Sequence, residues 1–145
     1  HQLQSHGKPL IACNYVKRTI PTTPVTTGLN KKFIKTDPDT TGLEEVSHSG
    51  FGVCLIHSGV FKKVERPWFD TVWIEDEEKE GELTIMGEDV FFFGKVKHHL
   101  GLSLFIDHDL SQEVTHLGEF EYHNRLAEAV LDEMQNDAVK EKLYG

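Results

Sequence analysis

Two adjacent carboxylates, Glu88 and Asp89, follow a glycine and precede a phenylalanine-rich segment in the stretch MGEDVFFFGKVKHHLG. A carboxylate can act as a general base when it lies within about 2.6–3.2 Å of the hydroxyl group whose proton it accepts. The same acids would stabilise a helix N-terminus by about 0.3–1 kcal/mol, because unpaired N–H groups there favour negative charge. Alone, the pair favours helix capping, and its chemical role depends on the residues around it.

Two other patterns accompany the acidic pair. Gly50 and Gly52 occur in SHSGFGVCLI, and glycines let a backbone approach a ligand closely, although a bulge or tight turn is their default explanation. His116 follows a segment that ends in acids, LFIDHDLSQEVTHLG. A lone histidine is more often hydrogen-bonded than bound to a metal. The three patterns gain weight only if folding brings them together around one cleft.

The first half of the chain predicts two strands and a long loop. The apolar run Lys8–Val16 is typical of a buried strand. Residues 17–41 are rich in Pro, Thr, Gly and Lys, which predicts a long loop of a kind that is often functional. A strand interrupted by Gly50 and Gly52 comes next, followed by a short helix near Gly59–Val64.

The second half predicts a helix at the acidic pair. Residues 65–89 show little periodicity, and Glu75–Glu82 is interpreted as a solvated acidic loop. Apolar residues recur with helical spacing over Glu88–Leu100, and Gly101 is expected to end that helix as a left-handed cap. A strand in LSLFID and a C-terminal helical segment over 121–145, with apolar residues aligned from Asn124 to Leu143, complete the pattern. Alternating strands and helices predict one α/β domain spanning 1–145.

Composition restricts the function. The net charge of −9 argues against a surface that binds a nucleic-acid backbone, which would need clustered Lys and Arg. Cys13 and Cys54 lie in apolar runs without Cys-x-x-Cys spacing, which suggests reduced core residues and a cytoplasmic protein, with a disulfide between them left open. No apolar run approaches the roughly 18 residues of a membrane span. The first residue is His1 rather than methionine, so a fragment is expected.

Taken in order, these pieces resemble the second half of nucleotide-sugar-dependent glycosyltransferases of the GT-A fold, in the large family 2-like group. The resemblance covers about 8–118. The matching pieces are KPLIACNYVKR, the glycine loop GFGVCLI, VF with PWF, GED leading to Gly101, and Asp107 with HLG. The resemblance implies a partial GT-A fold that forms the acceptor-side part of a catalytic domain. The reaction it implies is the transfer of a sugar from a nucleoside diphosphate sugar to an acceptor hydroxyl, with inversion at the anomeric carbon favoured.

The resemblance also implies roles for individual residues. Asp89 would be the general base, and Glu88 would orient the base or the acceptor. His116 would help to hold a divalent ion, Mn²⁺ or Mg²⁺, which bridges the donor diphosphate as a Lewis acid. The substrate-binding residues would be Gly50, Phe51 and Gly52 in the loop, with Trp68 and Phe69 stacking on an acceptor sugar.

The Asp-x-Asp motif of the family belongs upstream of Lys8, so the nucleotide-binding half is expected to be absent and activity of this chain alone is left open. DPDTTG is interpreted as a turn. FIDHDL follows a strand but comes after the acidic pair, so Asp107 is interpreted as a late acid that supports His116.

Two alternatives remain open. The first is an inactive binding or assembly module that forms homo-oligomers through an exposed sheet edge. The second is a metal-dependent hydrolase; its candidate ligands are His98, His99, His108, His116 and His123. The donor sugar and base, the acceptor (glycan, lipid or protein) and the stereochemical outcome are also open.

Overall fold

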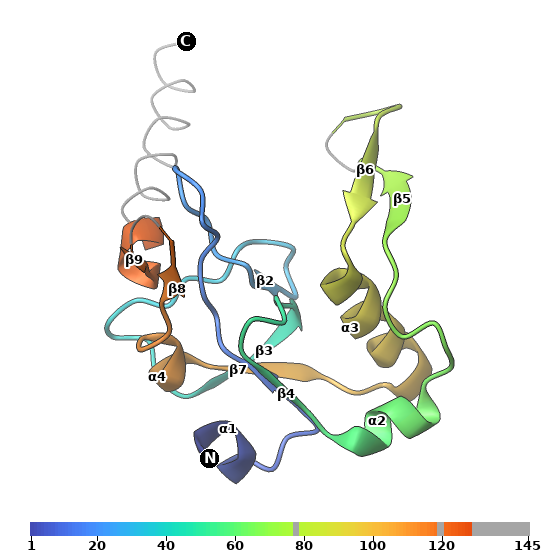
Figure 1. The fold of residues 1–145 in the computed structure, drawn as a ribbon, viewed down its shortest axis with the longest axis horizontal. Coiled ribbons are helices and arrows are strands. Elements are labelled where there is room, and N and C mark those ends of the chain that lie inside the picture. The colour runs from blue at the N-terminus through green and yellow to red at the C-terminus, as the bar shows by residue number, and fades with distance from the viewer. Residues whose placement is uncertain (77–78, 119–120, 129–145) are drawn as a thin grey trace.

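A mixed five-stranded sheet forms the centre of the computed structural model, which describes residues 1–76, 79–118 and 121–128 (Figure 1). The strand order is β2-β3-β7-β1-β4. Only β1 and β7 pair in parallel; the other neighbours are antiparallel. The strands are β1 (Leu10–Ala12), β2 (Thr27–Gly28), β3 (Leu43–His48), β4 (Cys54–Ile56) and β7 (Leu104–Asp107). The predicted α/β class is therefore confirmed as a mixed α/β architecture.

The helix α3 (Glu88–Leu100) packs on this sheet with the bounds that its apolar spacing predicted. Phe92, Phe93 and Val96 form its buried face, against apolar side chains of β1, β3 and β7. Gly101 ends the helix in the left-handed conformation, with φ of 64°, and its N–H donates to the carbonyl of Lys97. The predicted helix and its glycine cap are both confirmed.

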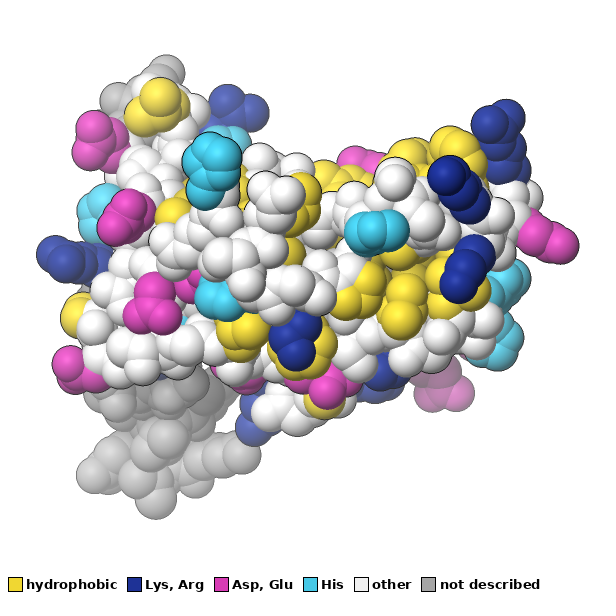
Figure 2. All heavy atoms as spheres, turned by 90° about the horizontal axis from the view of Figure 1, so that it is seen from below, with side chains coloured by type: hydrophobic (Ala, Val, Ile, Leu, Met, Phe, Trp, Pro, Cys, Tyr) yellow, Lys and Arg dark blue, Asp and Glu magenta, His cyan; other side chains and the backbone are white. Residues whose placement is uncertain are grey.

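The segment predicted as one interrupted strand is instead two strands, β3 and β4. They separate because β3 pairs with β7 and β2, whereas β4 pairs with β1 at the other side of the sheet. The helix α2 (Ser58–Lys63) follows β4, close to the predicted position, and the ring of His57 accepts a hydrogen bond from the N–H of Gly59. Figure 2 shows hydrophobic side chains exposed among Lys and Arg over the end of the molecule that carries α2.

The prediction of an irregular stretch over 65–89 is wrong in its second part. Strands β5 (Val72–Glu75) and β6 (Leu83–Met86) form an antiparallel hairpin that leads directly into α3 (Figure 1). Their short alternating patterns, VWIE and LTIM, have the period of two that a half-exposed strand shows. The acidic segment connects these two strands.

The remaining elements are short. The predicted strand over Lys8–Val16 is regular only from Leu10 to Ala12, with an isolated bridge at Val16. The short elements are α1 (Gln2–Ser5), α4 (His108–Ser111), β8 (His116–Leu117) and β9 (Glu121–Tyr122). Residues 124–128 are helical, and the rest of the predicted C-terminal helix lies outside the described residues. Within the described ranges, no helix has the length and apolar composition that crossing a membrane requires.

Both cysteines are free, although Cys13 directly follows β1 and Cys54 begins the neighbouring strand β4. Burial raises the pKa of the Cys13 thiol to about 11, and burial raises that of Cys54 to about 12. Both groups are therefore protonated and weakly nucleophilic at neutral pH. This agrees with the prediction that they are reduced core residues.

Phe92 is the centre of the aromatic part of the core, so its truncation tests how the fold is stabilised. It is fully buried, and its ring centroid lies 5.1–5.7 Å from those of four other phenylalanines, Phe51, Phe61, Phe69 and Phe93. We expect Phe92→Ala to lower the free energy of unfolding by about 3–5 kcal/mol in urea denaturation. The control Phe33→Ala, at a side chain that is 48% exposed, should cost about 1 kcal/mol or less. Equal losses would contradict this assignment of the core.

Candidate functional site

Tyr15, which follows β1, connects the three groups that sequence analysis singled out. Its phenol oxygen accepts a hydrogen bond of 2.9 Å from the backbone N–H of Gly52. Its ring packs edge-on against His116, with 5.7 Å between the ring centroids. Burial raises the pKa of Tyr15; the bond from Gly52 lowers it, and the nearby charges of Asp89 and Glu88 raise it further. The glycine loop and the histidine therefore both contact one aromatic side chain, and the charges of the acidic pair act on the pKa of that side chain.

Contact with Tyr15 also explains the two glycines. A Cβ atom at Gly50 would lie 2.2 Å from the phenol oxygen, and one at Gly52 would lie 2.6 Å from Cζ of the same ring. Real Cβ atoms do not approach other atoms this closely, so any larger residue would displace the tyrosine. Sequence analysis expected these glycines to make room for a ligand, whereas here they make room for a side chain of the protein.

The acidic pair occupies the N-terminus of α3, as predicted. Asp89 is half-buried, and its Oδ1 accepts a hydrogen bond of 2.8 Å from the N–H of Val90. Glu88 is exposed. Asp89 therefore caps the helix, and it does so through one of its two carboxylate oxygens. The second oxygen accepts no hydrogen bond from the part of the chain that the structure describes, so it remains available to a ligand.

The hydrogen bond of His116 fixes which ring nitrogen can act as a ligand. Nδ1 lies 3.0 Å from the carbonyl oxygen of Val16. Because a carbonyl only accepts, Nδ1 carries a proton and donates, which leaves Nε2 with the free lone pair in a neutral ring. A backbone carbonyl that orients a ligating histidine in this way is common around metal sites.

The described residues contain no group of three or more His, Cys, Asp or Glu side chains placed to hold a metal ion. The expected support of His116 by Asp107 is not found. Asp107 is buried, and its carboxylate accepts from the N–H of Leu110 at 3.0 Å and contacts Gln2 and His6, each at 2.9 Å. Burial would raise the pKa of Asp107, but these hydrogen bonds lower it below its ordinary value.

The aromatic residues predicted to bind an acceptor pack mainly against the protein. Trp68 donates from Nε1 to the carbonyl of Val64 at 2.9 Å, and its ring contacts Phe61 and the guanidinium of Arg66. The ring of Phe51 packs against Phe69, Phe92 and Phe93. Of the predicted residues Phe51, Trp68 and Phe69, it is Phe69, at 45% exposed, whose ring offers substantial surface to a ligand.

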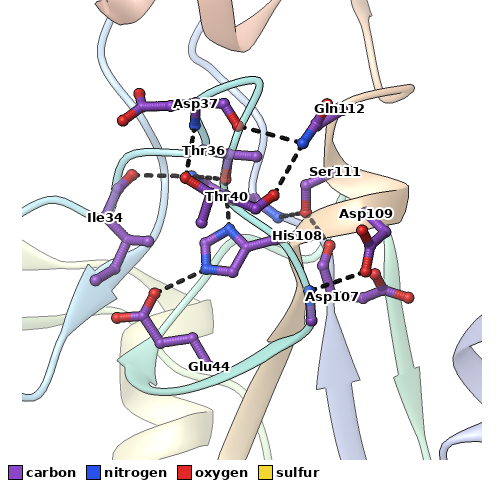
Figure 3. A network of polar contacts seen from close by, with 12 residues as sticks. Ile34, Thr36, Asp37, Thr40, Glu44, Asp107, His108, Asp109, Ser111 and Gln112 are labelled. Atoms are coloured by element: carbon purple, nitrogen blue, oxygen red, sulfur yellow. Dashed lines mark hydrogen bonds and ion pairs between the residues drawn. The ribbon is translucent and has the colours of Figure 1, made fainter.

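A buried polar network holds the strand end that carries Tyr15, and sequence analysis did not find it (Figure 3). His108 is buried and bridges Thr36, at 3.0 Å from Nδ1, and Glu44, at 2.7 Å from Nε2. The amide of Asn14 donates to the Thr36 hydroxyl at 3.1 Å, and its backbone N–H donates to the hydroxyl of Ser111 at 2.8 Å. These contacts fix the residue that precedes Tyr15.

The hydrogen-bond roles in this network are mutually consistent. A carboxylate only accepts, so Nε2 of His108 donates to Glu44, and Nδ1 of a neutral ring then accepts from the Thr36 hydroxyl. His108 is therefore engaged on both nitrogens and is placed as a structural residue. Among the five histidines of the alternative hydrolase, this one has no free nitrogen for a metal.

Comparisons with known proteins give no relative for this chain: no family model, no curated protein and no solved structure matches it. Its function is therefore argued from its own residues.

Paired substitutions test whether Tyr15 and the glycine loop form one unit. We expect Gly50→Ala to lower the free energy of unfolding by about 1–3 kcal/mol, because the new Cβ overlaps the phenol oxygen. In a Tyr15→Phe background that oxygen is gone and the nearest remaining ring atom is 3.0 Å away. The cost of Gly50→Ala should then shrink, which a double-mutant cycle from urea denaturation measures.

Gly52→Ala is the matched control for this cycle. Its Cβ would still lie 2.6 Å from Cζ after removal of the phenol oxygen, so its cost should persist in the Tyr15→Phe background. Additive effects of Gly50→Ala and Tyr15→Phe would show that the two residues do not meet.

Proposed function

We propose that this chain forms the acceptor side of an inverting, nucleotide-sugar-dependent glycosyltransferase in which Asp89 is the general base. The observation that carries the proposal is that the Gly50–Gly52 loop and His116 both contact Tyr15, whose pKa is raised by the charge of Asp89. These residues come from distant parts of the sequence, and the resemblance to GT-A enzymes assigns the loop, His116 and Asp89 to one active site.

In the proposed reaction, the acceptor oxygen attacks the anomeric carbon of the donor sugar. The bond from that carbon to the nucleoside diphosphate breaks, and the acceptor proton passes to the free oxygen of Asp89. A general base of this kind contributes about 100- to 10,000-fold to a rate. Glu88, exposed beside it, orients the acceptor hydroxyl. Tyr15 is a positioning residue, because it contacts both the glycine loop and the ring of His116.

His116 contributes Nε2 as a ligand in the proposed site. Mn²⁺ fits an imidazole together with oxygen ligands better than Mg²⁺ does. When bound, the ion would supply Lewis-acid stabilisation of the nucleoside diphosphate leaving group. The described residues bring no group of three or more ligands together, so its other ligands would be the donor phosphates and an Asp-x-Asp motif of the kind that GT-A enzymes carry. The free thiols of Cys13 and Cys54 support a reducing, cytoplasmic setting.

Asp89→Asn tests the base directly. The asparagine keeps an oxygen that can accept the hydrogen bond from Val90, so the helix should form normally. In a protein that also carries the nucleotide-binding half, we expect the transfer rate from UDP- and GDP-sugars to fall by about 100- to 10,000-fold. The Kd of the donor should change by less than about two-fold, since a base acts only in the chemical step. Radiolabelled sugar transfer and calorimetry provide the two measurements.

Glu88→Gln is the matched control, since it removes the neighbouring charge at an exposed position. It should raise the KM for the acceptor with a much smaller effect on kcat. A variant at Asp89 with near-normal turnover would show that this carboxylate only caps the helix. His116→Ala should weaken UDP or GDP binding in the presence of Mn²⁺ while binding without the ion is unchanged.

A further inference from the structure

A groove runs along one side of α3, beginning next to the proposed base. Two cavities of about 480 and 280 Å³ adjoin each other there and share Ser47, Gly94 and His98 in their linings. We call their combined surface the α3 groove. The lining of the first cavity includes Met86 and Val90, which flank the Glu88–Asp89 pair in the sequence. One end of the α3 groove therefore lies beside Asp89.

The α3 groove has an apolar floor of elongated shape. At the end near Asp89 the floor is formed by Met86, Val90 and Phe91. At the other end it is formed mainly by leucines, including Leu29 and Leu102. No carboxylate side chain lines either cavity. A long apolar surface of this kind fits a linear hydrocarbon chain better than a glycan, which would need polar partners along its length.

Basic side chains border this apolar floor. Lys95, His98 and His99 line the first cavity. Lys95 donates one hydrogen bond of 2.8 Å to the carbonyl of Pro67, so its ammonium group retains two further N–H donors. Lys97 also lines the second cavity, but it is paired with Glu45 at 3.2 Å. Lys95, His98 and His99 thus provide N–H groups beside the apolar floor that can donate to an anion.

Gly94, shared by the two cavities, keeps the α3 groove open. A glycine in a helix interior costs about 1 kcal/mol relative to alanine. A Cβ built at Gly94 meets no atom within 4 Å, so neither packing nor a left-handed conformation requires glycine at this position. The empty space above this residue is the middle of the α3 groove.

We propose that the α3 groove binds a single-chain lipid with an anionic head group. The hydrocarbon chain lies over Gly94, and the anion is bound by Lys95 with His98 and His99. Six residues separate Asp89 from Lys95, a rise of about 9 Å along the helix. A lipid held in this way can place a hydroxyl of its head group at Asp89. Its role as the acceptor rests on the proposed glycosyltransferase function, whereas the binding itself does not.

Calorimetry with defined probes below their micelle concentrations tests this binding. Dodecyl phosphate should bind, while inorganic phosphate, which has no chain, and dodecyl maltoside, which has no charge, should bind at least about ten-fold more weakly. Equal affinity for the maltoside would overturn the anion site. No binding of dodecyl phosphate would overturn the proposal as a whole.

Gly94→Leu locates the site, because it fills the α3 groove and also raises helix propensity, so the variant should fold. It should weaken dodecyl phosphate binding by at least about ten-fold, and Gly94→Ala should have a smaller effect. Unchanged affinity in Gly94→Leu would place any bound lipid elsewhere. Lys95→Gln should also weaken binding, whereas Lys62→Gln on α2 makes the same change of charge away from the groove and should not.

Asp89→Asn distinguishes this inference from the proposed function. It should bind dodecyl phosphate with wild-type affinity, because the substituted carboxylate acts on a hydroxyl and not on the chain or the anion. Lipid binding in a protein that transfers sugar to other acceptors but not to the bound lipid would overturn the role as acceptor while retaining the site. Sugar transfer without lipid binding would overturn the lipid site alone.

Discussion

The contact between Tyr15 and the Gly50–Gly52 loop is the constraint on which the rest of the candidate site depends. With 2.2 Å between a hypothetical Cβ at Gly50 and the phenol oxygen, the loop and the ring can occupy these positions only if residue 50 is glycine. The same ring contacts His116 and lies in the field of Asp89. A displacement of Tyr15 would therefore change the relative positions of the glycine loop and His116.

The residue before Tyr15, Asn14, is itself held by polar contacts. Asn14 is fully buried and bonds to Ser111 and Thr36, and His108 connects Thr36 to Glu44 on β3. The side-chain oxygen of Asn14 is buried and accepts no hydrogen bond from the described residues, which costs about 1–3 kcal/mol against the bonds that the rest of the network makes. The network gives the long loop before β3 a defined position although that loop buries few large apolar side chains.

Local patterns predicted α3 and its cap because the information lies within the helix: apolar residues at helical spacing and a glycine at its end. The hairpin β5–β6 was not predicted, since two strands of four residues beside an acidic segment give only a weak period of two. Asp89, Gly50 and His116 could be selected by type and order, but their meeting point could not. Tyr15 contacts residues 37 and about 100 positions away, and no feature of NYV in the sequence indicates either contact.

Helix α3 connects the candidate site to the rest of the fold because it presents three surfaces with different chemistry. Phe92, Phe93 and Val96 anchor one side in the core, the N-terminus holds the acidic pair, and Gly94 opens the α3 groove on another side. A glycine in mid-helix weakens α3, but the aromatic contacts of Phe92 offset that cost. Because the base and the groove belong to one rigid element, a chain bound over Gly94 keeps a fixed distance from Asp89. In the proposed complex, that fixed distance determines which hydroxyl group of the bound lipid can reach Asp89.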